Sequence, residues 1–231
     1  MTEQSHIIIT IDGPAGSGKS TVARQLADRL EFRFLDTGAM YRAVALAIVE
    51  AGVQESDDHE VARVADSVAL RFEDDQLMLN GKDVTGAIRT PEVTAVSSIV
   101  ASNPAVRSRM VELQRAIGIE GSMVTEGRDQ GTVVFPDADH KFFITATLET
   151  RARRRQRELA SGGSELSISI VQEQLRQRDE RDEQRAHAPM KPADNAVIVD
   201  TSEMSIGEVV QHLVSRVHSG SDSDQLSGDQ G

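Results

Sequence analysis

The sequence predicts an α/β protein whose parallel sheet is covered by helices on both faces. Short β-branched runs, typical of buried strands, alternate along the chain with stretches whose apolar residues recur at helical spacing. Strands that alternate with helices of roughly 10–15 residues indicate βαβ units, and such units build parallel sheets. Ligands of these sheets bind at the carboxyl ends of the strands, so we expect the functional residues to follow strand ends.

The N-terminal part begins with a strand at Ile7–Ile11 that stops at a glycine-rich loop. An amphipathic helix follows from Ser20 to Leu30, and a second short strand is predicted at Phe32–Leu35. The segment Tyr41–Ala51 is apolar almost all round, which indicates a buried helix, and Gly52 provides its C-terminal stop.

The middle of the chain interrupts this alternation and is therefore interpreted as an insert. Val68–Glu73 and Gln76–Leu79 are expected to pair as strands across Asp74-Asp75, with a further hairpin turn at Asn80-Gly81. Two helices should then open where a capping residue precedes a proline, at Thr90-Pro91 and Asn103-Pro104.

The last part of the chain supplies the remaining strands and helices of the sheet domain. Strands are predicted at Met123–Thr125, Lys141–Thr145 and Ala196–Val199, and helices at Leu148–Leu159, Ile168–Arg185 and from the capping box Ser205/Glu208 to about His218. The polar segment 219–231 should be a disordered tail. The strand ends expected to gather at one edge of the sheet are Asp12-Gly13, Asp36-Thr37, Glu126-Gly127 and Asp200.

Composition excludes several functional classes. Acidic residues outnumber basic ones by 37 to 25, giving a net charge of −12, so a surface that binds nucleic acid stably is not expected. The apolar runs are far shorter than the roughly 18–20 residues of a spanning helix, the first residues lack a signal-peptide pattern, and the chain has no cysteine. We therefore expect a cytoplasmic protein, and a monomer, because no long exposed apolar stripe is evident.

The glycine-rich loop carries the strongest chemical signal. Gly13–Ser20 matches G-x-x-x-x-G-K-[ST] at every fixed position, between a strand and a helix. In such a loop, main-chain amides and the helix N-terminus surround phosphates, while Lys19 reaches the β- and γ-phosphates and Ser20 offers its hydroxyl to Mg²⁺. The predicted ATP-binding residues are Gly13, Pro14, Ala15, Gly16, Ser17, Gly18, Lys19, Ser20 and Thr21.

The loop alone leaves open a small-molecule kinase, a GTPase switch and a motor or clamp ATPase. A GTPase normally reads guanine through an Asn/Thr-Lys-x-Asp segment after a later strand, which this sequence lacks. Val197–Asp200 resembles the metal-binding strand of an ATPase, but an aspartate commonly ends a last strand. A nucleotide-dependent binding protein that hydrolyses ATP slowly also stays open, whereas an RNA contact lacks aromatic platforms, since aromatics are 3% of the chain.

Arginine placement favours a kinase. Only four of the 25 cationic residues are lysines, and arginines cluster within 151–157 and 176–185 of an acidic chain. Phosphoryl transfer depends mostly on positioning and on neutralising negative charge, and a phosphate acceptor needs no general base. A basic helix followed by Ser161–Ser164 fits a closing lid, although a solvated helix face is the ordinary alternative for such a run.

Four segments add to the phosphate loop: Ile9–Pro14, Asp36–Arg42, Glu126–Pro136 and Arg178–Asp182. Through these segments the chain resembles the bacterial cytidylate kinases of the long type, and the resemblance spans nearly all of residues 6–218. It implies a P-loop nucleoside monophosphate kinase fold, with a five-stranded parallel sheet, an inserted α+β nucleotide-binding subdomain and a small lid. The implied boundaries are a kinase domain at 5–218, an acceptor-binding insert at about 38–103, a lid at about 150–170 and the tail at 219–231.

The same resemblance implies transfer of the γ-phosphate of ATP to CMP or dCMP with Mg²⁺, and it assigns roles to matching residues. Arginines matching Arg42, Arg128 and Arg185 hold the acceptor phosphate, and positions matching Arg178 and Asp182 face the ribose. Positions matching Ser98, Arg107 and Asp129 read cytosine; Thr37 and Tyr41 complete the predicted acceptor-binding set. From the residues alone, Ser98 could instead bond its own helix backbone, and Tyr41 could simply cap the buried helix.

The predicted catalytic residues are Lys19, Arg128, Arg154 and Arg155. Arg151, Arg154 and Arg155 match the family's lid, and the sequence does not decide which of them contact phosphate in the closed state. Gln130 stands where the family more often has an apolar residue and has no functional interpretation. Another nucleotide or metabolite kinase of the same fold, such as a UMP/CMP or adenylate enzyme, stays open as the alternative.

Overall fold

The computed structural model describes residues 6–73, 76–161, 163 and 165–225, with side chains as far as residue 219. The predicted turn at Asp74-Asp75 and two residues of the Ser161–Ser164 loop lie outside the described residues. The chain forms two compact units. The first comprises residues 1–35, 121–184 and 188–231, and the second comprises residues 36–120 and 185–187.

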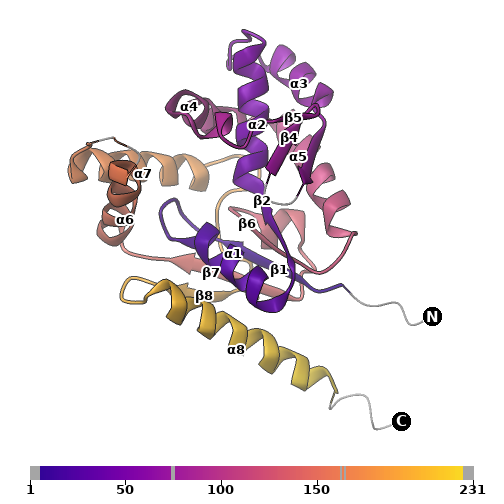
Figure 1. Ribbon diagram of the computed structural model, residues 1–231, viewed down its shortest axis with the longest axis vertical. Helices are drawn as coiled ribbons and strands as arrows, with labels where there is room; N and C mark the ends of the chain where they lie inside the picture. The colour runs from indigo at the N-terminus through magenta and orange to yellow at the C-terminus, as the bar shows by residue number, and fades with distance from the viewer. Residues whose placement is uncertain (1–5, 74–75, 162, 164, 226–231) are drawn as a thin grey trace. The chain divides into compact units, whose positions relative to one another are not determined.

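The first unit is built on a parallel sheet with the strand order β2-β6-β1-β7-β8 (Figure 1). The strands are β1 (Ile8–Asp12), β2 (Arg33–Asp36), β6 (Met123–Gly127), β7 (His140–Thr145) and β8 (Val197–Asp200). In the register of β1, Asp12 pairs with Gly127 on one side and with Phe143 on the other. The ends of β1 and β6 therefore lie side by side, and the residues that follow them leave the sheet at the same edge.

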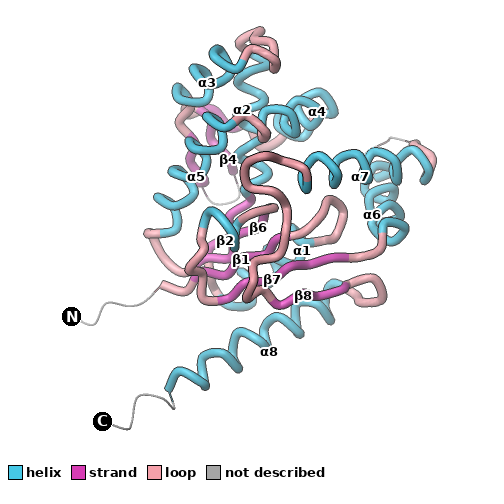
Figure 2. Tube along the Cα trace, turned by 180° about the vertical axis from the view of Figure 1, so that it is seen from behind, coloured by secondary structure: helices cyan, strands magenta, loops and turns pink. Residues whose placement is uncertain are grey.

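Successive side chains of β1 point to opposite faces of the sheet. Ile9 and Ile11 enter an apolar core formed with α1 (Lys19–Leu30) and α8 (Ile206–Gln225), and Figure 2 shows α8 running along the strands. On the other face, Asp12 bonds to the start of a π-helical turn, η2 (Gln130–Val134). Two further helices, α6 (Leu148–Ser161) and α7 (Ile168–Glu183), pack together through a smaller apolar cluster that includes a residue of the phosphate loop, Ala15.

The second unit is an α+β structure around α2 (Thr37–Glu50). This helix contacts α3, α4, α5, the short 3₁₀ helix η1 and β4. The bounds are α3 (Asp58–Ser67), η1 (Ala87–Arg89), α4 (Pro91–Val100) and α5 (Pro104–Gly118), with the antiparallel strands β3 (Leu70–Glu73), β4 (Gln76–Leu79) and β5 (Lys82–Asp83). This unit is wider than the insert expected at about 38–103.

Helix starts with clear capping signals are confirmed. The Thr90 side chain accepts a hydrogen bond from the Val93 amide at 3.3 Å. The Asn103 side chain accepts from two amides of α5, and the Ser205/Glu208 box forms as predicted. No helix within the described part of the chain is long and apolar enough to cross a membrane.

Two helix ends differ from the prediction. Helix α7 stops at Glu183, because the Asp182 carbonyl accepts a hydrogen bond from the Met190 amide at 2.8 Å, so Arg185 does not share a helical face with Asp182. Helix α8 continues to Gln225 instead of ending near His218, and the Ser219 hydroxyl bonds back to a carbonyl one turn earlier. Residues 219–225 of the expected tail are therefore helical, while 226–231 lie outside the described residues.

Candidate active site

The phosphate loop runs from the end of β1 to the start of α1 in a conformation that requires glycine. Gly16 has a φ of 74°, and Gly13 has a φ of 150°, both in the region that side chains rarely adopt. A Cβ atom at Gly13 would lie 2.0 Å from the Ile144 carbonyl oxygen of β7. The backbone therefore passes so close to the neighbouring strand that only glycine fits.

Lys19 begins α1 and is buried beside an acidic strand end. Its Nζ lies 3.8 Å from Glu126 Oε2 and donates to the Pro14 carbonyl at 3.3 Å, while Ser20 Oγ donates to Glu126 Oε1 at 3.0 Å. Burial, together with the nearby Arg128 guanidinium, lowers the pKa of Lys19 to about 8, although Glu126 acts in the opposite direction. The loop and the end of β6 thus place a desolvated cation, a hydroxyl and a carboxylate together at one edge of the sheet.

Helices α6 and α7 hold the loop from outside. Asp179 Oδ1 accepts from the Ala15 amide at 3.2 Å, and Arg151 Nη1 donates both to the Ala15 carbonyl, at 3.0 Å, and to Asp179 Oδ2. Arg151 and Asp179 are both buried. Arg151, which the resemblance assigned to a lid, therefore forms a structural ion pair that fixes Ala15.

Arg154, also on α6, contacts a different residue of the loop. It donates to the Ser17 carbonyl at 3.1 Å and to the hydroxyl and carbonyl of Thr201, which follows β8. Arg155 is half-buried and pairs with Glu158 on its own helix at 2.9 Å. Of the two lid arginines predicted to be catalytic, only Arg154 contacts the phosphate loop in this structure.

The segment after β6 carries the other predicted residues of the first unit. Arg128 Nε donates to Asp182 Oδ2 at 2.8 Å, and both groups are nearly enclosed. Asp129 is 3% exposed, and Arg178 is half-buried on α7. Arg128 is thus oriented by the carboxylate that the resemblance had assigned to the ribose.

In the second unit, Arg107 lies over the ring of Tyr41, with its Cζ 5.9 Å from the ring centroid, and donates to the Ala101 carbonyl at 3.3 Å. Arg42 faces Asp36 at 3.4 Å, and Asp36 also caps α2. The contact with Arg107 gives Tyr41 a partner beyond its own helix.

The other predicted residues lie at the following places. The Ser98 hydroxyl donates to the Ala95 carbonyl at 3.1 Å, as a serine inside a helix does. Thr37 is buried at the start of α2, Thr21 is exposed on α1, and Arg185 is half-buried beyond the end of α7.

Several residues of the site carried no predicted role. Glu126 was expected only at the strand edge, yet it contacts both Lys19 and Ser20. The sequence could have indicated this role, because Glu126 comes at the end of a predicted strand, and an acid at the carboxyl end of a strand next to β1 is well placed to bind a metal ion. Asp179 and Thr201 carried no such signal. Asp200, the candidate for an ATPase metal-binding strand, accepts instead from the amide and hydroxyl of Ser202.

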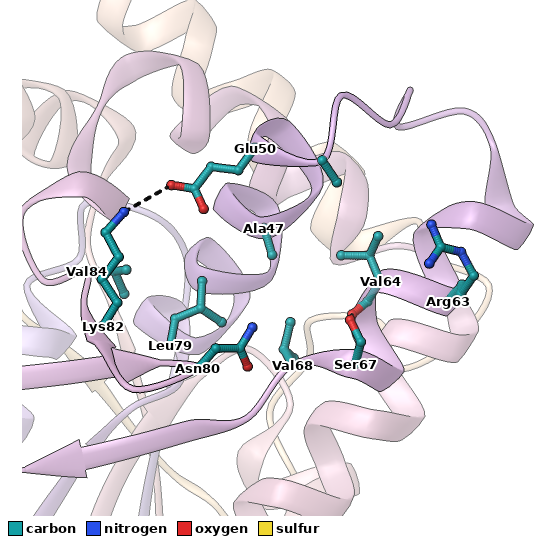
Figure 3. A pocket seen from close by; sticks show the side chains of 11 residues that line it. Ala47, Glu50, Arg63, Val64, Ser67, Val68, Leu79, Asn80, Lys82 and Val84 are labelled. Carbon is teal, nitrogen blue, oxygen red and sulfur yellow. Dashed lines mark hydrogen bonds and ion pairs between the residues drawn. The ribbon is translucent and has the colours of Figure 1, made fainter.

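Pockets occur in the described parts of both units. In the first, a polar pocket of about 370 Å³ is lined by Thr150, Arg153, Arg154, Arg157, Ser202, Glu203 and Met204, of which Arg154 also contacts the phosphate loop. In the second, a pocket of about 410 Å³ opens between α2, α3 and the small sheet (Figure 3). Lys82 and Glu50 pair across its rim at 3.6 Å, and none of the predicted acceptor residues is among the residues that line it.

A parallel sheet whose first strand leads through a phosphate loop into a helix, with a buried lysine and an acidic neighbouring strand end, defines a P-loop kinase. The chain belongs to the cytidylate kinase family, whose model, described as "Cytidylate kinase", matches residues 9–219.

Similar proteins agree with this placement. A cytidylate kinase of Pelotomaculum thermopropionicum is 48% identical over 217 residues, which cover 92% of this chain and 96% of that protein. A cytidylate kinase of Mycobacterium leprae is 47% identical over 212 residues, covering 91% and 95%. A solved gluconokinase of Sinorhizobium meliloti shares the fold, with a TM-score of 0.51 and 13% identity over 96% of this chain and 97% of that one.

Proposed function

We propose that the protein transfers the γ-phosphate of ATP to CMP or dCMP and releases ADP with CDP or dCDP. Membership of the cytidylate kinase family supports this assignment. The observation that carries it is the phosphate loop with a buried Lys19 next to the Glu126 carboxylate and the Arg128 guanidinium. Such an arrangement suits a polyanionic donor whose charge must be balanced during transfer.

The donor is assigned to the first unit. The loop amides and Lys19 would hold the phosphates, and the nucleoside would occupy the pocket of about 370 Å³ that Arg154 helps to line. Arginine side chains can stack on a base and bind phosphate oxygens, so a pocket lined by Arg153, Arg154 and Arg157 suits a nucleotide.

Mg²⁺ is assigned to Ser20 and Glu126. Their side chains bond to each other at 3.0 Å, and they offer the hard oxygen ligands that this ion prefers. Mg²⁺ commonly uses one or two carboxylates together with substrate phosphates and water, which fits so small a donor set. Bound with ATP, the ion would neutralise charge that develops on the phosphate oxygens.

The acceptor is assigned to the predicted set of arginines and acids. Arg42, Arg128 and Arg185 would hold its phosphate, because a dianion is best matched by several planar guanidinium groups. Arg178 and Asp182 would contact the ribose, and Thr37 and Tyr41 would complete the site. Ser98, Arg107 and Asp129 would read cytosine, since an aspartate accepts from its amino group while an arginine donates to its ring acceptors.

Transfer then requires little covalent chemistry from the protein. The acceptor phosphate is itself the nucleophile, so the chain contributes alignment and charge balance. Lys19 acts on the donor phosphates from a desolvated position, where its charge is effective. Arg128, held by Asp182, and Arg154, held at Ser17, would flank the moving group.

An assay of ADP release with CMP, dCMP, UMP, AMP and GMP tests this function directly. We expect the highest kcat/KM with CMP or dCMP and little ADP release without an acceptor. A higher kcat/KM with UMP or AMP would contradict the acceptor assignment. Fast hydrolysis of ATP without any acceptor would instead indicate an ATP-dependent switch.

A further inference from the structure

Asp12, the last residue of β1, is a buried carboxylate to which the reaction described above gives no role. It is 4% exposed. Its Oδ1 accepts from the Gln130 amide and its Oδ2 from the Gly131 amide, each at 2.8 Å. Both oxygens are therefore bound by consecutive main-chain amides at the start of η2.

These two bonds replace an ordinary helix cap. The first amides of a helix lack partners within the helix, and the residue at the N-cap position usually supplies an acceptor. In η2 that position belongs to Asp129, whose side chain makes no capping hydrogen bond. The capping function is performed instead by Asp12, which comes from a different strand.

The bonds fix a particular stretch of main chain. Gly127 is held in the sheet opposite Asp12, and Gln130 and Gly131 are held by the Asp12 carboxylate. Between these anchors lie only Arg128 and Asp129. The main chain that carries both side chains is therefore tied at each end to one residue of β1.

Close packing leaves the turn little freedom. The Thr125 hydroxyl donates to Gln130 Oε1 at 2.9 Å, which accounts for a buried amide side chain at this position. A Cβ atom at Gly131 would lie 2.9 Å from Thr10 Oγ1. Burial, assisted by the nearby Asp129 charge, raises the pKa of Asp12 to about 7, although the two amides act in the opposite direction. Burial thus disfavours the charged form of Asp12, and the hydrogen bonds from the two main-chain amides are what stabilises that form.

We propose that Asp12 is a positioning residue for the acceptor: its carboxylate fixes the main chain that presents Arg128 and Asp129. The proposal rests on the proposed function, in which Arg128 binds the acceptor phosphate and Asp129 reads the base. Asp12 acts through these residues and touches neither nucleotide itself.

The test compares Asp12→Asn with the matched control Asp139→Asn. Asparagine keeps the size of the side chain, but its amide group can accept only one of the two main-chain bonds. Asp139 accepts from the Ile8 amide at 2.8 Å at the opposite end of the same strand. We expect Asp12→Asn to raise KM for CMP about tenfold or more and to reduce the preference for CMP over UMP, with KM for ATP changed less than about threefold. The control should leave all three values unchanged.

Amide hydrogen exchange provides a readout that does not depend on the acceptor. Asp12→Asn should accelerate exchange at Gln130 and Gly131 while the amides of β6 keep wild-type rates. If the wild-type protein prefers another acceptor, the proposed function fails, yet the exchange result still tests the role of Asp12. Unchanged exchange, or an equal rise of KM for ATP and CMP, overturns the proposal.

A second variant keeps the test decisive if Asp12→Asn does not fold. Thr125→Val removes the bond to the Gln130 side chain and preserves the shape of the buried residue. We expect a smaller change in the same direction, about two- to fivefold in KM for CMP, with KM for ATP unchanged. A rise in KM for ATP alone, or no change in either constant, would overturn the proposal.

Discussion

The Asp179 carboxylate accepts a hydrogen bond from the Ala15 amide at 3.2 Å, so a side chain near the end of α7 fixes the conformation of the phosphate loop. The same carboxylate pairs with Arg151, which donates to the Ala15 carbonyl. One buried ion pair thus holds both polar groups of a single loop residue.

Substitution Asp179→Asn should weaken the donor site. The variant leaves Arg151 buried without its charged partner, which typically destabilises a fold by about 3 kcal/mol, and it loosens Ala15. We expect KM for ATP to rise about tenfold while KM for CMP changes little. Steady-state kinetics and urea unfolding measure the two effects. Glu180→Gln on the exposed side of the same helix is the control, and an equal effect from that variant would argue against a specific role.

Substitution Lys19→Ala should remove catalysis while leaving the fold intact. Loss of a cation that acts on the donor phosphates should lower kcat by about 10²–10³. The thermal midpoint should stay almost unchanged, because Lys19 is the first residue of α1 and does not belong to the apolar core. Lys82→Ala in the other unit serves as the control. Parallel loss of folded protein and activity would point to a structural role for Lys19.

Stability should depend on pH through Lys19. Its pKa of about 8 lies below the usual 10.5, so between these values the unfolded chain keeps a proton that the folded protein has released. Stability contributed by this group therefore rises with pH above about 8. Comparing wild type with Lys19→Met by urea unfolding at pH 7.5 and 9.5, we expect the free-energy difference to shift by about 2 kcal/mol in favour of the wild type. A constant difference would show that the lysine titrates normally.

Substitution Asp129→Ala should reduce base discrimination. Uracil presents an oxygen where cytosine presents an amino group, so a buried acceptor at this place disfavours UMP. We expect the ratio of kcat/KM for CMP to that for UMP to fall more than tenfold, with KM for ATP nearly constant. The exposed Asp137→Ala in the same segment is the control. An equal loss with both acceptors would remove Asp129 from base recognition.

Local signals made most of the fold predictable from the sequence. Most strands of the parallel sheet are short runs rich in β-branched or aromatic residues, and the cap at Thr90 depends on residues only a few positions away. Helix α3 was not predicted, although its buried residues Val61, Val64 and Ala65 recur at helical spacing. Its N-terminal cap at Asp57 was the available sign.

The candidate site was less predictable, because its pairs join distant parts of the chain. In the sequence, Arg151 belongs to a basic run that resembles a ligand-binding surface. Its partner, Asp179, lies on another helix, and the pairing depends on how α6 and α7 pack. The sequence shows where arginines cluster. It does not show whether a given arginine pairs with an acid of the protein or binds the substrate, because both kinds have the same sequence neighbours.

The close approach of Gly13 to β7 shows that the phosphate-loop motif meets two separate requirements, one of the fold and one of the reaction. A side chain at that position would collide with the Ile144 carbonyl whether or not a nucleotide ever binds. A related protein without catalytic activity could lose Lys19, but it would still need glycine at position 13 to keep the same sheet. Glycine at the first position of the motif is therefore required by the packing of neighbouring strands, whereas Lys19 is required for the proposed chemistry.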